Sequence, residues 1–126
     1  SGTMRLITEN AGIRDELKAE PDLFPNFVNE AIRLVTPVTY MRRTATHDTE
    51  LGGQHIAEGE KIVMYYPAAN RDPAKFPEPD KFDIRRSNAK EHLSFGQGPH
   101  VCLGQRVANM QLCFGNSPLT GSLSGR

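Results

Sequence analysis

A long irregular stretch, residues 67–101, most constrains how this chain can fold. Four prolines interrupt its first part, residues 67–90: Pro67, Pro73, Pro77 and Pro79. Glycines then recur through residues 95–104. Proline lacks the backbone N–H that helices and sheets use. Structureless segments of this length are uncommon inside compact domains and usually carry function. We therefore expect this stretch to do more than connect two elements.

Four helices are expected outside this stretch, at residues 3–9, 13–19, 22–36 and 102–111. Each has apolar residues at the three- and four-residue spacing of a helix. Asp22 is a plausible N-cap for the third helix. That helix has apolar residues on more than one side, so it should be largely buried.

Strands are expected in the segment after Pro37. Residues 39–45 and 61–66 are rich in β-branched and aromatic side chains, which favour strands. Between them, Gly52-Gly53 marks a hairpin and Glu58-Gly59 marks a second turn. The predicted fold class is therefore mainly α with a small antiparallel β element.

Glu30 and Arg33 stand three residues apart on the third helix, so they share a face and can pair. On an arbitrary helix such a pair is most often a solvated surface feature. This helix is too apolar for that explanation, and a buried charge needs partners. The sequence therefore favours an interior pair whose charges are satisfied by other groups.

Charge and composition exclude several classes of function. Lys and Arg number 15, and so do Asp and Glu, which gives a formal net charge of zero. A nucleic-acid binder would carry a basic excess or stripe. No apolar run approaches the length of a membrane span. We expect no nucleic acid and no membrane as partner, and a cytoplasmic location. Two cysteines do not suggest a disulfide scaffold.

Residues 95–104 read Phe-Gly-Gln-Gly-Pro-His-Val-Cys-Leu-Gly, a glycine-rich loop that should bring Cys102 to the first turn of a helix. Backbone N–H groups and the positive end of a helix lower the pKa of a thiol in that position. Glycines carry no side chain, so the backbone can approach something flat and bulky. A thiolate pressed against a planar ligand is the arrangement that an axial haem ligand requires.

Other chemistries stay open for this loop. A zinc site needs about four ligands, and only His100 and Cys102 cluster here. His100 is a possible base for a nucleophilic Cys102, but a separation of two residues across a loop does not by itself form such a pair. A phosphate loop would need Gly-Lys-Ser/Thr or a preceding strand, and neither is present. A plain structural loop is a further alternative. Cys113 is expected to be a small buried hydrophobe.

The loop resembles the cysteine-loop signature of the cytochromes P-450: Phe95-Gly96-x-Gly98-x-His100-x-Cys102-x-Gly104. Glu30-Ala-Ile-Arg33 looks like the family's Glu-x-x-Arg pair. Pro79-Asp-Lys-Phe82-Asp-Ile-Arg85 looks like its Pro-x-x-Phe-x-x-Arg segment, and Asn70-Arg71-Asp72-Pro73 fits the bridge before that segment. The resemblance covers residues 1 to about 111, and it is to soluble bacterial members, including those that act on terpenes.

The resemblance implies haem b as cofactor and a role for each matching residue. Cys102 would be the proximal thiolate ligand of the iron. His100 and Arg43 would pair with the propionates, and Phe95 would pack beside the sulfur. Gly98 and Gly104 would face the porphyrin, and Gly96 belongs to the same cofactor-binding loop. A structural Glu-Arg-Arg network would consist of Glu30, Arg33 and Arg85.

The resemblance also implies that much of the family's fold lies outside this sequence. Residues 1–111 look like the C-terminal, haem-binding third of a cytochrome P-450. The family's acid–alcohol pair, which delivers protons to bound oxygen, would lie upstream of Ser1, so no catalytic residue of that kind is expected here. We expect residues 112–126 to be an aberrant, unstructured tail, because Pro118 and three glycines disfavour a helix. A frameshift near Leu112 would explain this tail.

The function implied is that of a haem-thiolate monooxygenase, which inserts one oxygen atom of O2 into a small hydrophobic substrate such as a terpenoid or similar hydrocarbon. Residues 38–41 would border the substrate pocket, and a ferredoxin or flavodoxin-type donor would dock near Cys102. The isolated chain is expected to be inactive. The alternative is a degenerate, non-catalytic product that binds haem weakly or not at all.

Overall fold

The computed structural model describes residues 2–120 of the chain. Its helices are α1 (Gly2–Glu9), α2 (Ile13–Ala19), α3 (Phe24–Val35), α4 (Tyr66–Ala69) and α5 (Gln105–Thr120). Its strands are β1 (Tyr40–Thr44), β2 (Thr49–Leu51), β3 (Gln54–Ile56) and β4 (Lys61–Tyr65). Single 3-10 turns occur at Pro21–Leu23, Ala89–Glu91 and Gly98–His100. The fold class is therefore mainly helical with small antiparallel sheets, as the sequence predicts.

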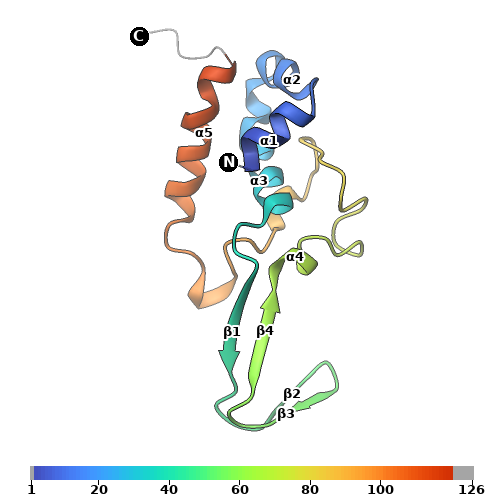
Figure 1. Cartoon of the computed structure of the whole chain (residues 1–126), viewed down its shortest axis with the longest axis vertical. Coiled ribbons are helices and arrows are strands. Elements are labelled where there is room, and N and C mark those ends of the chain that lie inside the picture. Colours follow the sequence, from blue (N-terminus) through green and yellow to red (C-terminus); the bar gives the residue numbers. More distant parts are fainter. Residues whose placement is uncertain (1, 121–126) are drawn as a thin grey trace.

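The helices and the strands occupy opposite ends of the molecule. Figure 1 shows α1, α2, α3 and α5 gathered at one end, with the β1–β4 ribbon running away from them and the β2–β3 hairpin at the far tip. In the ribbon, Tyr40 lies opposite Tyr65 and Thr44 lies opposite Lys61, in antiparallel register. The hairpin turns at the predicted Gly-Gly pair, where both glycines have positive φ.

The hydrophobic core forms around α3. Its buried members are Ile7, Ile13, Leu17, Phe27, Val28, Ile32 and Ile84. Phe27 is fully buried and its ring packs against those of Phe24 and Phe82. The core therefore joins the first three helices to the long irregular stretch, because Phe82 and Ile84 belong to that stretch.

The third predicted helix differs from the observed one at its start. A 3-10 turn occupies Pro21–Leu23, α3 begins at Phe24, and no side chain caps it, so the prediction of Asp22 as N-cap is wrong. At the other end, Thr36 takes a left-handed conformation with φ of 39°. This conformation ends α3 just before Pro37, where the chain turns toward β1.

The C-terminal helix differs from the prediction at both ends. It begins at Gln105, so Cys102 precedes the helix instead of lying in its first turn. It continues to Thr120, although residues 112–126 were expected to be unstructured. Leu112 and Cys113 pack against the core cluster, and this burial favours the helix at the point where the sequence pattern weakens. Residues 121–126 lie outside the described part of the chain.

Candidate cofactor site

Cys102 is held by a short loop that folds back on itself. The backbone N–H of Cys102 donates to the carbonyl of Phe95 at 2.8 Å. The N–H of Gly96 donates to the carbonyl of Leu93, also at 2.8 Å, and closes a tight turn that Gly96 completes with φ of 74°. These two bonds fix the Cys102 backbone against residue 95, and the Cys102 side chain stays exposed.

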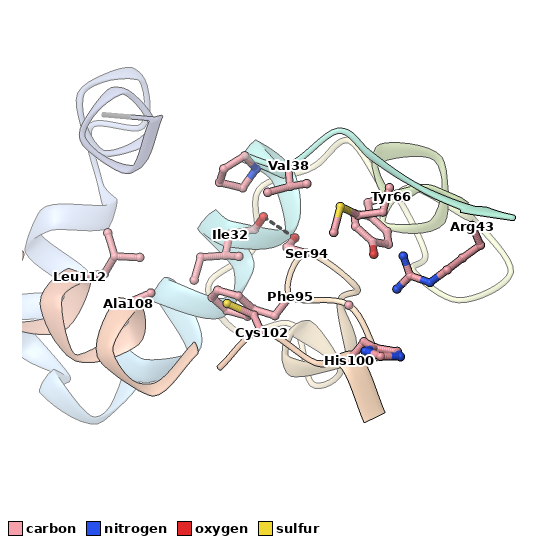
Figure 2. A pocket seen from close by; sticks show the side chains of 13 residues that line it. Ile32, Val38, Arg43, Tyr66, Ser94, Phe95, His100, Cys102, Ala108 and Leu112 are labelled. Carbon is pink, nitrogen blue, oxygen red and sulfur yellow. Dashed lines mark hydrogen bonds between the residues drawn. The ribbon is translucent and has the colours of Figure 1, made fainter. Parts of the chain in front are cut away.

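A cavity of about 410 Å³ opens beside this loop, and α3, β1 and α5 contribute to its walls. Figure 2 shows Cys102 and Phe95 at its centre, Ala108 and Leu112 toward one end, and Arg43 and His100 toward the other. Ile32 and Val38 line a further side. The cavity is therefore apolar over most of its surface, with two basic side chains gathered at one end.

The structure brings together most of the residues predicted to bind the cofactor. Arg43, Phe95, Gly96, His100 and Cys102 all line this one cavity, although they come from segments more than fifty residues apart. The predicted substrate-bordering segment also contributes, through its first and last residues, numbers 38 and 41.

Two of the predicted glycines do not line the cavity: Gly98 and Gly104. A Cβ added at Gly104 would lie 3.8 Å from the Cys102 sulfur, which is ordinary contact. Gly98 has φ of 75°, a conformation that favours glycine, and open space where a Cβ would stand. At Gly98, therefore, the backbone conformation itself favours glycine.

The residues present fit a haem group. Haem needs a soft donor on one face of a flat apolar ring, and cations near its two carboxylates. The cavity offers an exposed thiol next to an aromatic ring, apolar walls, and Arg43 and His100 at one end. Among residues 2–113, no group of three or more His, Cys, Asp or Glu side chains could hold a metal ion, so the zinc interpretation gains no support there.

A buried ion cluster is centred on Glu30 of α3. Arg33 binds the Glu30 carboxylate through two nitrogens, Nε and Nη2, at 2.7 and 2.8 Å, and both side chains are 0% exposed. Arg86 donates to the same carboxylate at 3.0 Å, and the backbone N–H of Asp83 donates at 3.2 Å. The expectation of an interior pair with further partners is therefore confirmed.

The predicted third member of this cluster, Arg85, is wrong. Its side chain is half exposed and pairs with Glu16 on α2, at 3.6 Å, and with Glu20 just after α2, at 2.6 Å. The next residue, Arg86, turns inward instead. Adjacent loop residues point in different directions, and the spacing of the motif selects Arg85, which is the neighbour that faces outward.

The two cluster arginines also organise the irregular stretch. Arg33 donates to the carbonyls of Asn70, Pro79 and Lys81. Arg86 donates to those of Pro77, Glu78 and Lys81. Buried carbonyls need donors, and here two guanidinium groups supply them in place of a helix or a sheet. This explains how so long a segment without regular structure is ordered.

Sequence reasoning missed two residues next to the cysteine loop. His92 is buried, its ring lies 5.6 Å from that of Phe95, and its Nδ1 accepts the N–H of Ser94. Burial lowers the pKa of His92 to about 4, and the Arg33 cation acts in the same direction, against Glu30. Tyr66 lines the cavity beside Gly96. Neither residue stands in a motif, so the sequence carries no signal for them.

Comparison with known proteins identifies the family. The family model described as Cytochrome P450 matches residues 5–115. The chain belongs to the cytochrome P450 family. Linalool 8-monooxygenase of Pseudomonas putida is 43% identical over 112 residues, which are 89% of this chain and 27% of that protein. Cytochrome P450-terp of a Pseudomonas species is 47% identical over 95 residues, 75% of this chain and 22% of that protein.

Solved structures of this P450 family superpose on almost the whole chain. Cytochrome P450-153 from Novosphingobium aromaticivorans matches with a TM-score of 0.91 and 42% identity over 100% of this chain and 33% of its own length. CYP108D1 from the same species has a TM-score of 0.90 and 43% identity over 95% of this chain and 29% of its own. The chain thus spans about a third or less of the relatives it matches. No helix in the described part of this P450 chain is long and apolar enough to cross a bilayer.

Proposed function

We propose that this chain is the haem-binding part of a haem-thiolate monooxygenase, with Cys102 as the axial ligand. One observation carries the proposal: an exposed thiol lies in an apolar cavity that has two basic side chains at one end. Bound there, haem b would supply the iron chemistry that activates O2, with the thiolate as its donor.

The residues of the chain would hold and orient the cofactor. The Phe95 carbonyl fixes the Cys102 backbone, so the sulfur would meet the iron from a constrained position. Arg43 and His100 would form charge-assisted bonds with the propionates at the basic end of the cavity. Ile32, Ala108 and Leu112 would contact the ring edge and keep water away from it. Residues 38 and 41 would border the substrate.

The substrate proposed is a small hydrophobic molecule such as a terpenoid. The cavity wall at Pro37, Val38 and Met41 is apolar, and one relative is named for oxidation of linalool. We further propose that a ferredoxin or flavodoxin-type protein delivers electrons near Cys102. Residues that protonate bound oxygen are expected in the parts of the P450 fold that this chain does not cover. We therefore expect the chain by itself to be inactive as a monooxygenase.

Haem titration of the chain and of two cysteine variants tests the proposal. The unmodified chain should bind haem and, after reduction and addition of CO, give the spectrum of a thiolate-ligated haem. Cys102→Ser should abolish that spectrum, because serine supplies no thiolate. Cys113→Ser is the matched control and should keep it, since Cys113 packs against the core cluster on α5.

Three results would contradict the proposal: no haem uptake by the unmodified chain, the same thiolate spectrum from Cys102→Ser, or its loss in Cys113→Ser alone. The first would instead favour the alternative of a degenerate product that does not bind haem.

A further inference from the structure

Asn70 connects the end of α3 to the start of the cysteine loop. It follows α4, is 0% exposed, and is far in sequence from both segments that it joins. Its Nδ2 donates to the Thr36 hydroxyl and to the Ser94 hydroxyl, each at 2.9 Å. Its Oδ1 accepts the backbone N–H of Leu93 at 2.7 Å. One amide group therefore satisfies three partners in two separate segments.

The hydrogen-bond directions require an amide at this position. The Thr36 hydroxyl donates to the Arg33 carbonyl at 2.6 Å, and the Ser94 hydroxyl donates to the Ile32 carbonyl at 3.0 Å. Both hydroxyl protons are thus committed, so each oxygen can only accept from residue 70. The Leu93 N–H can only donate to it. A carboxylate of the same shape would satisfy Leu93 and place an oxygen against two acceptors.

These contacts continue directly to Cys102. The Leu93 N–H donates to Asn70 Oδ1, and the Leu93 carbonyl accepts the Gly96 N–H. Ser94 precedes Phe95, whose carbonyl accepts the Cys102 N–H at 2.8 Å. The turn that holds Cys102 is therefore anchored at its base by the buried Asn70 side chain. The Asn70 backbone is fixed in turn, because its carbonyl accepts from Arg33 Nη1 at 2.7 Å.

We infer that Asn70 is a positioning residue, which fixes the cysteine loop through Leu93 and Ser94 and so places the Cys102 sulfur. Its effect on a bound haem rests on the proposed function, whereas its effect on the loop does not. Asn70 touches neither the cavity nor Cys102, so it acts through the turn.

Amide hydrogen exchange in the full, haem-free chain tests the effect on the loop. The quantity measured is the exchange rate of the Cys102 amide divided by that of the Ala31 amide inside α3, which corrects for overall stability. In Asn70→Asp this ratio should rise by about tenfold. The variant loses the two hydrogen bonds that Nδ2 donates to Thr36 and Ser94, and together these change an opening equilibrium by about that factor. Ser94→Ala, which keeps two of the three contacts, should raise it less.

The matched control is Asn26→Asp. Asn26 is a partly buried amide that also holds distant backbone, because its Nδ2 donates to the carbonyls of Ile84 and Arg86 at 2.7 and 3.0 Å. It lies away from the cysteine loop, so its variant should lose stability and leave the ratio unchanged. An unchanged ratio in Asn70→Asp, or an equal rise in Asn26→Asp, overturns the inference. If Asn70→Asp does not fold, an unchanged ratio in Ser94→Ala overturns it.

A second measurement separates this inference from the proposed function. In haem-loaded protein, the share of the thiolate-type CO spectrum should fall in Asn70→Asp and persist in Asn26→Asp. Absence of that spectrum from the unmodified protein would contradict the proposed function, and the exchange ratio would still decide whether Asn70 positions the loop. A normal thiolate share in Asn70→Asp would overturn the effect on Cys102.

Discussion

Replacing Arg86 by methionine should destabilise the protein far more than the same change at Arg85. The two residues are neighbours in sequence, carry the same charge and lie in the same loop. Arg86 is buried and bonds to Glu30, whereas Arg85 is half exposed and pairs with Glu20 on the surface. Methionine keeps an unbranched, flexible stem in both variants and removes the guanidinium group, so the same chemical change is made at both positions.

The magnitude follows from the contacts that are lost. Arg86 makes four hydrogen bonds, one to a carboxylate at 3.0 Å and three to backbone carbonyls at 2.7, 3.1 and 3.2 Å. Without it, the carbonyls of Pro77 and Glu78 lose their guanidinium donor, and Glu30 keeps only Arg33 as a cationic partner. Removing one member of a buried ion cluster typically costs about 3–5 kcal/mol. Surface pairs such as that of Arg85 contribute little.

Urea unfolding followed by far-UV circular dichroism measures both variants under the same conditions. Arg86→Met should lower the free energy of unfolding by about 3–5 kcal/mol, or abolish cooperative unfolding if the chain is only marginally stable. Arg85→Met should stay close to the unmodified chain. Equal losses in the two variants, or a larger loss for Arg85→Met, would refute the assignment of Arg86 to the cluster.

Three further predictions concern titration and thiol reactivity. Burial lowers the pKa of His92 to about 4, so the unfolded chain takes up a proton on this side chain at a higher pH than the folded chain does. The free energy of unfolding should therefore fall by about 3 kcal/mol as the pH drops from 6.5 to 4. His92→Asn should remove this part of a pH-dependent unfolding curve. The hydrogen bond and charge of Arg85 lower the pKa of Glu20. The contribution of this pair to folding stability is therefore present at neutral pH and is lost as the pH falls below 4.5. Arg85→Met should flatten that acid limb. Burial raises the pKa of the Cys113 thiol, so mass spectrometry should show that iodoacetamide alkylates exposed Cys102 first, and faster labelling of Cys113 would contradict the packing of α5.

The sequence by itself determined the helices around α3, the Gly-Gly hairpin and the identity of the cysteine loop. These features are local: an amphipathic period, a two-residue turn and a motif in which each glycine and the cysteine stand at fixed offsets. The apolar surroundings of Glu30 and Arg33 were enough to predict that the pair is buried, because an apolar helix cannot leave two charges unpaired.

Only the tertiary structure decided which arginine completes the cluster, how far α5 extends and what anchors the cysteine loop. Arg85 and Arg86 differ in direction because an irregular backbone has no period from which to read side-chain orientation. Leu112 lies in a helix because it packs on a core that distant segments build. Asn70 acts through partners 23 to 34 residues away, and hydrogen bonds of that range leave no pattern along the chain.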